Sequence, residues 1–113
     1  MSRSLISTHI LDTALGRPAS GVAVMLSGFA PSGWSPIAAG ITDDNGRIEE
    51  LGPESLVAGK YRLTFDTESY FAAQSTSSFF PEVVLAFTVA EGEQHYHVPL
   101  LLSPFAYSTY RGN

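Results

Sequence analysis

Two histidines and one arginine in this chain of 113 residues could together hydrolyse a small polar molecule. They are His9, Arg47 and His97, on three separate segments. Because an unperturbed imidazole has a pKa of about 6.5, it can accept or donate a proton near neutral pH. A guanidinium is a permanent cation whose planar fork suits the paired polar atoms of a planar ligand. This set could therefore activate water and stabilise a developing negative charge without a metal or cofactor.

These residues also have ordinary structural interpretations. A single histidine in a strand is more often structural than catalytic, and His95 is expected to be a solvated residue where a strand begins. Arg47, after a hairpin turn, is by default a surface charge, and Tyr107 and Tyr110 are by default core or subunit-contact aromatics. Residue types alone leave both interpretations open, because the sequence does not show that the three segments meet.

A metal site is a separate hypothesis. His95 and His97 lie two residues apart and so on one face of a strand, a spacing that zinc sites use. The chain has no cysteine, so a third ligand would have to be His9 or a carboxylate. We therefore expect no catalytic metal and no cofactor.

Short stretches that are rich in apolar and β-branched residues, some of them alternating and the one at 82–90 almost wholly apolar, predict the strands. We expect strands at residues 5–11, 22–29, 34–42, 60–66, 82–90 and 96–102. The segment 43–46, Asp-Asp-Asn-Gly, predicts a tight turn directly before Arg47, because Asn-Gly readily takes positive φ. Residues 51–59 are expected to be loop with at most a short edge strand. One helix is expected at 67–74, capped by Thr67 with Glu68 in its first turn. Seven or so strands with one helix indicate an antiparallel β-sandwich.

Composition excludes several classes of function. The net charge is −5 and no cationic cluster is present, which argues against nucleic-acid binding. No apolar run approaches the ~20 residues of a membrane span, and the first residues lack the apolar region of a secretory signal. Without cysteine there are no disulfides or thiolate sites. We expect one domain over residues 1–113, in the cytoplasm, with the peroxisome as the alternative compartment.

Motifs at both ends of the chain resemble those of the transthyretin-related 5-hydroxyisourate hydrolases. The first are STHILD at residues 7–12 and GRPA at 16–19, and the last are HVPLLLSP at 97–104 and YSTYRG at 107–112. Further matches between them, such as GKY at 59–61, follow in the family's order. The resemblance therefore covers nearly the whole chain.

The resemblance implies a transthyretin-like (prealbumin-like) antiparallel β-sandwich of two four-stranded sheets with one short helix. It implies hydrolysis of 5-hydroxyisourate to 2-oxo-4-hydroxy-4-carboxy-5-ureidoimidazoline in urate degradation, by a homotetramer that is a dimer of dimers with active sites where subunits meet. No nucleic acid or membrane partner is expected. Residues carried over as catalytic are His9, Arg47 and His97. Those carried over as substrate-binding are His9, Arg47, Tyr110, Arg111, Gly112 and Asn113.

The tail departs from the family at one position and leaves an alternative function open. The family usually ends Tyr-Arg-Gly-Ser, whereas this chain has Asn113, which can hydrogen-bond but cannot relay a proton as a hydroxyl can. We expect Asn113 to serve, because the terminal carboxylate is retained. Transthyretins share the sandwich but lack the Tyr-Arg-Gly ending and bind thyroid hormones. The alternative is therefore a non-catalytic small-ligand-binding module, and a secreted structural sandwich is a weaker third interpretation.

Overall fold

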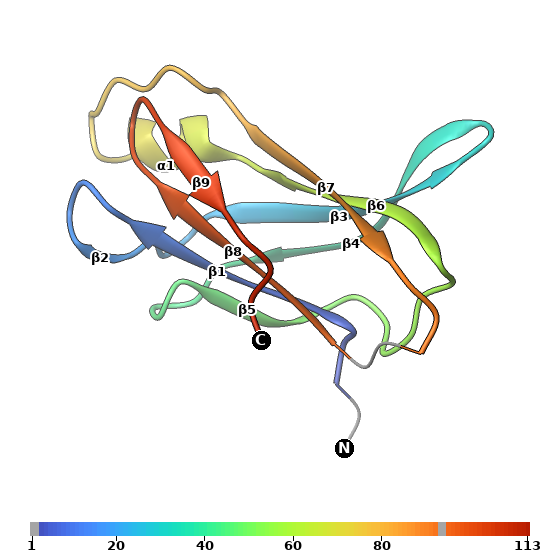
Figure 1. The fold of residues 1–113 in the computed structure, drawn as a ribbon. Helices are drawn as coiled ribbons and strands as arrows, with labels where there is room; N and C mark the ends of the chain where they lie inside the picture. The colour runs from blue at the N-terminus through green and yellow to red at the C-terminus, as the bar shows by residue number, and fades with distance from the viewer. Residues whose placement is uncertain (1–2, 93–94) are drawn as a thin grey trace.

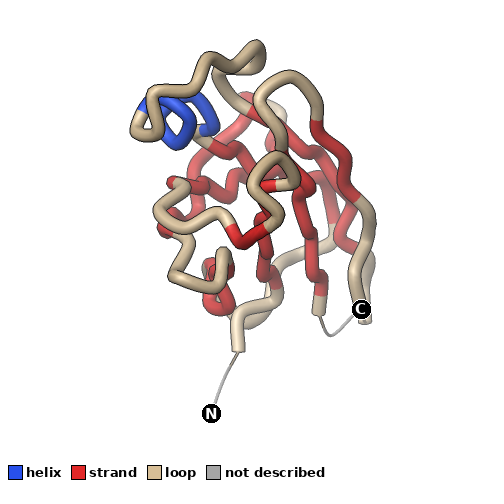
Figure 2. The backbone as a smooth tube through the Cα atoms, turned by 90° about the vertical axis from the view of Figure 1, so that its left-hand side faces the viewer, coloured by secondary structure: helices blue, strands red, loops and turns tan. Residues whose placement is uncertain are grey.

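Two β-sheets pack face to face in the computed structural model, which describes residues 3–92 and 95–113 (Figure 1). The first sheet has the strand order β4-β3-β6-β7 and is antiparallel throughout. Its strands are β3 (Ala23–Ala30), β4 (Gly33–Ile41), β6 (Gly59–Phe65) and β7 (Val83–Val89). The helix α1 (Thr67–Ala72) joins β6 to β7, and in both views it lies at the opposite end of the molecule from the end of the chain (Figure 2).

The second sheet carries the residues of interest. It has the order β2-β1-β8-β9, and β5 pairs with β1 as well. Its strands are β1 (Ile6–Asp12), β2 (Arg17–Pro18), β5 (Arg47–Leu51), β8 (Tyr96–Leu102) and β9 (Tyr107–Thr109). Strand β1 is therefore central. It pairs with β5, the strand that follows the Asp-Asp-Asn-Gly turn, and with β8 on its other side.

Alternation along the strands builds the core between the two sheets. On β1, Ile6 and Ile10 point inward and are fully buried, and Leu100 of β8 does the same. Leu63 and Phe65 of β6 meet them from the other sheet. Each such side chain stabilises the fold by about 1.5–3 kcal/mol relative to exposure. Because successive side chains alternate, the residues between them lie on the outward face of this sheet.

The predicted two-sheet sandwich with one short helix is confirmed, but three details differ. Strands β1 and β8 run parallel, because periodicity gives a strand's faces and not its direction. The second sheet has five strands among the described residues rather than four. Strands β2, β5 and β9 were not predicted, since β5 carries two adjacent glutamates and the other two span only two and three residues.

The helix is shorter than predicted and has a different cap. It ends at Ala72, and its N-cap is Asp66, whose side chain accepts a hydrogen bond from the Ser69 N–H at 3.2 Å. Thr67 is fully buried and donates to the Phe80 carbonyl at 2.8 Å instead. No helix in the described part of the chain is long and apolar enough to cross a membrane.

Candidate active site

The strand register brings three of the predicted residues onto the outward face of the second sheet. His9 of β1 is paired with Arg47 of β5, and Ser7 of β1 is paired with His97 of β8. Because Ser7 and His9 are two residues apart, both point the same way. The three segments that the sequence left unconnected are therefore joined through β1.

Ser7 makes the closest side-chain contacts in this group. Its Oγ lies 2.8 Å from His97 Nδ1 and 2.8 Å from His95 Nε2. Ser7 is 6% exposed, and both histidines are half-buried. His95 directly precedes β8, as expected, but it is partly covered and hydrogen-bonded rather than fully solvated.

The turn before Arg47 is fixed by its own side chains and by β1. Asp43 Oδ1 accepts hydrogen bonds from the Asn45 N–H at 2.9 Å and from the Arg47 N–H at 3.0 Å. Gly46 has φ 74°, and a Cβ there would lie 2.5 Å from the Ile10 carbonyl oxygen. The Gly46 carbonyl in turn accepts from the Ile10 N–H at 2.7 Å. Only glycine lets the turn approach β1 so closely, and this approach places Arg47 beside His9.

Burial and the arginine act together on the two predicted catalytic histidines. The pKa of His97 is lowered from its usual 6.5, first by desolvation and then by the positive charge of Arg47 and the neighbouring His9 and His95. The pKa of His9 is lowered by desolvation and Arg47, against smaller opposing effects of the Asn45 backbone and Asp43. Both imidazoles are therefore neutral at pH 7, the form that accepts a proton.

The C-terminal tail packs against His97 at a glycine. The Gly112 N–H donates to the His97 carbonyl at 2.8 Å, and the two residues form an isolated antiparallel bridge. A Cβ at Gly112 would lie only 2.7 Å from Cδ2 of the His97 ring. The absence of a side chain thus lets the tail lie on the edge of the imidazole, and the next residue, Asn113, reaches the pocket.

These groups surround a small polar cavity of about 150 Å³. The side chains of its lining include cations, one carboxylate, two imidazoles and neutral hydrogen-bonding groups. The lining residues are Arg3, Ser7, Thr8, Arg47, Glu49, His95, His97 and Asn113. His9 lies beside the cavity through its pairing with Arg47. A base, a fixed cation and several hydrogen-bonding groups in one place suit attack of water on a polar, planar ring.

Two residues predicted to bind substrate lie elsewhere in this single chain. Tyr110 and Arg111 line a different cavity of about 320 Å³, together with residues of β7 and with Tyr96. The Arg111 guanidinium lies 4.6 Å from the centre of the Tyr96 ring, a cation–π contact. Of the four predicted tail residues, Gly112 contacts His97 and Asn113 lines the polar cavity.

Ser7 was not predicted from the sequence to belong to this site, and His95 was considered only as a residue at the start of a strand or as a metal ligand. The signal was present, since Ser7 shares a strand face with His9 and His95 shares one with His97. What the sequence lacked was the pairing of β1 with β8, which sets Ser7 beside His97. Among residues 3–92 and 95–113, no three His, Asp or Glu side chains are grouped to hold a metal ion.

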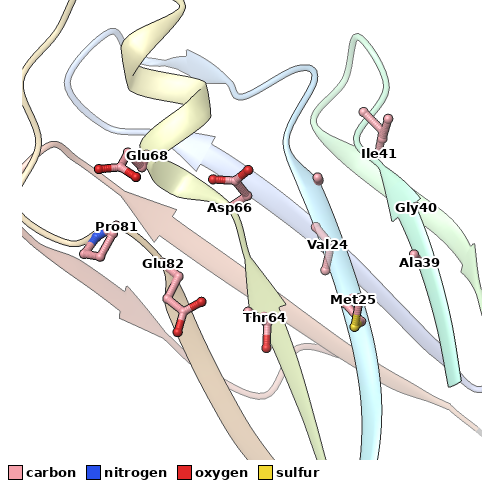
Figure 3. Close-up of a pocket in the computed structure, with 11 residues that line it drawn as sticks. Val24, Met25, Ala39, Gly40, Ile41, Thr64, Asp66, Glu68, Pro81 and Glu82 are labelled. Carbon is pink, nitrogen blue, oxygen red and sulfur yellow. The ribbon is translucent and has the colours of Figure 1, made fainter. Parts of the chain in front are cut away.

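A larger cavity lies on the outward face of the other sheet. It measures about 800 Å³ and is lined mainly by β3, β4 and β6 together with the segment from β6 to β7. Figure 3 shows Met25 and Ile41 on one side of it and the carboxylates of Asp66, Glu68 and Glu82 on the other. It has no histidine and no cation in its lining. It therefore offers no group whose usual pKa lies near neutrality, and the small polar cavity is the candidate for chemistry.

Comparisons with known proteins agree with this fold. A family profile described as "HIUase/Transthyretin family" matches residues 6–112. The 5-hydroxyisourate hydrolase of Salmonella typhimurium is 46% identical over 111 residues, covering 97% of this chain and 82% of the relative. The solved Klebsiella pneumoniae 5-hydroxyisourate hydrolase is 38% identical, with a TM-score of 0.86 over 97% of this chain and 100% of that one. Sea bream transthyretin, solved in complex with thyroxine, is 39% identical with a TM-score of 0.90 over 96% and 94%. Because hydrolase and transthyretin share the backbone, side chains must distinguish them.

Proposed function

The chain belongs to the HIUase/Transthyretin family, and we propose that it hydrolyses 5-hydroxyisourate in the polar cavity between β1, β5, β8 and the tail. The observation that carries this proposal is the placement of His97 and Arg47 in the lining of one cavity, with His9 paired to Arg47 on the same face. The side-chain chemistry supports a hydrolase, and its relatives carry that name.

In the proposed reaction His97 is the general base. Its Nδ1 is engaged by Ser7, so Nε2 is the nitrogen left to take a proton from water. The hydroxide adds to a ring carbonyl carbon, the adjacent C–N bond breaks, and the leaving nitrogen takes the proton back from Nε2. The six-membered ring opens to give 2-oxo-4-hydroxy-4-carboxy-5-ureidoimidazoline. His9 orients the water beside the base.

Arg47 has two roles in this proposal. Its guanidinium binds the polar edge of the substrate and stabilises the negative charge that develops on the carbonyl oxygen. In other hydrolases, removing one such donor costs roughly 3–4 kcal/mol of transition-state stabilisation. The Asp43 hydrogen bonds hold the backbone of this turn, so that Arg47 need not be reoriented when substrate binds.

The tail closes the cavity in this proposal. Gly112 seats it on His97, and Asn113 offers an amide that can donate to and accept from the substrate. Arg111 holds the tail through its contact with the Tyr96 ring. Direct substrate contacts from Tyr110 and Arg111 would have to come from another subunit. If Asn113 acts only as a hydrogen-bonding group, Asn113→Ser should change kcat by less than about threefold, a difference of under 1 kcal/mol.

We also propose the homotetramer, a dimer of dimers. Phe105 and Tyr110 are 67% and 60% exposed in the single chain, and exposed aromatics of this kind are typical of subunit contacts. Strands β7 and β9 are the ends of their sheets among the described residues, so their outer hydrogen-bonding groups can pair with another copy. The cavity lies on the outward face of the second sheet, where a facing subunit would complete it and exclude water.

A second candidate function is a binding module without catalysis. The observation in its favour is the likeness to sea bream transthyretin, whose TM-score of 0.90 exceeds the 0.86 of the solved hydrolase. A binding module does not need a neutral imidazole next to a fixed cation. The two functions therefore differ in turnover, and not in whether a small planar ligand binds.

The test is turnover of 5-hydroxyisourate generated in place from urate and urate oxidase. Circular dichroism should be followed together with absorbance, because the compound also decays spontaneously and only an enzyme yields one enantiomer. We expect faster decay with a chiral product from the wild-type chain, and loss of both in Arg47→Gln. Decay at the spontaneous rate with a racemic product, while urate still binds, would instead establish the binding module.

A further inference from the structure

A buried hydroxyl joins the proposed base to a second histidine. Ser7 Oγ is 2.8 Å from His97 Nδ1 and 2.8 Å from His95 Nε2, and Ser7 is only 6% exposed. The backbones of β1 and β8 already pair along this stretch, so the fold does not require a side-chain bridge. Burying a serine hydroxyl between two imidazoles therefore needs a reason of its own.

The single proton of the Ser7 hydroxyl limits how the two imidazole rings can be protonated. A hydroxyl has one proton to donate and lone pairs that accept, and a neutral imidazole has one N–H and one bare nitrogen. If both rings are neutral and the hydroxyl proton lies in the bridge, one ring must donate to Ser7 while the other accepts from it. The N–H position of His97 and that of His95 are therefore coupled through a single oxygen.

Two arrangements satisfy this rule, and they give His97 opposite properties. In the first, His97 Nδ1–H donates to Ser7, Ser7 donates to His95 Nε2, and His97 Nε2 is bare and can act as a base. In the second, the direction is reversed and His97 carries its proton on Nε2, where it can act as an acid. His97 passes from base to acid when its Nε2 takes up a proton while two protons move along the bridge, one from Nδ1 to Ser7 and one from Ser7 to His95.

The charges around His97 make such a shift useful. A proton taken up by His97 creates a positive charge close to that of Arg47, and this repulsion already contributes to its lowered pKa. His95 lies at the other end of the bridge. The charged and titratable side chains that line the cavity or act on His97 are His9, Arg47, Glu49, Arg3 and His95.

We propose that Ser7 is a positioning residue that fixes the N–H of His97 on Nδ1 and lets His95 share the positive charge formed during catalysis. The proposal rests on the proposed function and names two further residues for it. When water gives a proton to His97 Nε2, the Nδ1 proton passes to Ser7 Oγ and the Ser7 proton passes to His95 Nε2. His95 becomes the imidazolium, and His97 is neutral with its proton on Nε2.

The second half of the reaction reverses these transfers. His97 gives its Nε2 proton to the leaving nitrogen as the C–N bond breaks. The His95 Nε2 proton returns to Ser7, and the Ser7 proton returns to His97 Nδ1. Each group ends as it began, and the net change is one proton moved from water to the leaving nitrogen.

Three variants separate positioning from a purely structural role. Ser7→Ala removes the bridge. His95→Gln leaves an amide oxygen that can accept from Ser7 but cannot take up a proton. Ser4→Ala is the matched control, because Ser4 is also a buried serine near β1 and its Oγ donates to the Ile6 carbonyl at 2.6 Å without contacting a histidine.

For Ser7→Ala we expect kcat to fall about tenfold to a hundredfold, less than the ~10²–10⁴ of a lost acid–base group, with KM changed less than threefold. The acidic limb of the kcat profile should move to lower pH, because the His97 imidazolium loses a hydrogen-bond acceptor.

His95→Gln should lower kcat severalfold. Ser4→Ala should lower the unfolding temperature without moving the acidic limb. Wild-type kcat and pH profile in Ser7→Ala would overturn the positioning role, and wild-type kcat in His95→Gln would overturn the charge sharing.

A measurement without substrate makes the test independent of the proposed function. Long-range ¹H–¹⁵N NMR correlations of the imidazole rings at pH 7 to 8 report which nitrogen carries the proton. We expect Nδ1–H for His97 in the wild type and in His95→Gln, and Nε2–H in Ser7→Ala. Nε2–H in the wild type would contradict the inference. Absent turnover with Nδ1–H present would instead count against the hydrolase function alone.

Discussion

The two outward faces of the sandwich differ in size, polarity and chemistry. The groove on the β4-β3-β6-β7 sheet has about five times the volume of the cavity on the other sheet, 800 Å³ against 150 Å³. Its lining is mostly apolar with carboxylates on one side (Figure 3). The small cavity holds histidines, arginines and one glutamate. The comparison teaches that proton-transfer groups, and not volume, indicate where this fold can carry out a reaction.

Replacing one residue by glutamine in each region should give the largest difference in kcat between the two regions. His97→Gln removes the proposed base and should lower kcat by about 10²–10⁴. Met25→Gln, in the groove and 42% exposed, should leave kcat unchanged. Steady-state turnover with thermal unfolding of both variants checks this. Equal losses in the two variants with both folded would remove the distinction between the regions.

A matched pair of glycines sharpens the comparison. Gly112→Ala would set a Cβ 2.7 Å from His97 Cδ2, so that the ring or the tail must move. A displacement of this kind costs on the order of tenfold to a hundredfold in rate. Gly40→Ala, in the groove lining, would meet two Ile48 methyl groups at 3.3 Å and one Leu51 methyl group at 3.7 Å. We expect it to change stability by roughly 1 kcal/mol or less and kcat not at all.

If Gly112→Ala retains wild-type kcat, the tail is not held against His97 during turnover. The position of the His97 ring then depends on Ser7 alone. A crystal structure of the variant would show which of the two partners moved.

The turn before Arg47 should have a smaller effect. Asp43→Ala removes the acceptor for the Asn45 and Arg47 N–H groups, whereas Asp43→Asn keeps an acceptor oxygen. We expect kcat/KM to fall roughly tenfold in the first variant through less precise placement of Arg47, and less in the second. Kinetics at saturating and limiting substrate measure this. Equal losses in the two would show that the carboxylate charge matters and the turn geometry does not.

The pH dependence of stability should show the smallest effect. The pKa values of His9 and His97 are lowered in the folded chain, so below about pH 6.5 the unfolded chain binds more protons than the folded one. The free energy of unfolding should therefore rise with pH up to about 6.5. Above that pH these two groups should cause no further change in it. Melting temperatures from pH 5 to 8 in wild type and His97→Gln measure this. An equally steep slope in the variant would assign the effect to other groups.

The sequence predicted the sandwich because its strands alternate clearly and its turns carry Asn-Gly and Gly-Pro signals. It predicted His9, Arg47 and His97 through residue chemistry and family resemblance, and the structure places them on one face. It missed Ser7 and the role of His95, because their contact depends on parallel pairing of two segments almost ninety residues apart. Local patterns carry no information on such pairing, which is decided by burial over the whole core.

The sequence also did not predict on which side of the sheet each tail residue lies. Tyr110 and Gly112 both belong to the YSTYRG motif, but Gly112 contacts His97 while Tyr110 lines a separate cavity. In a three-residue strand such as β9, too few residues alternate to assign a face with confidence from sequence. The side on which each tail residue lies follows instead from the β8–β9 register.

The most direct test of the central claim is a crystal structure of the wild-type chain grown with uric acid, a planar analogue of the substrate that it cannot hydrolyse. We predict uric acid in the polar cavity, with Arg47 on its polar edge and His97 Nε2 facing a ring carbonyl. Uric acid in the groove beside Met25 and Ile41, with the polar cavity holding only water, would contradict the account.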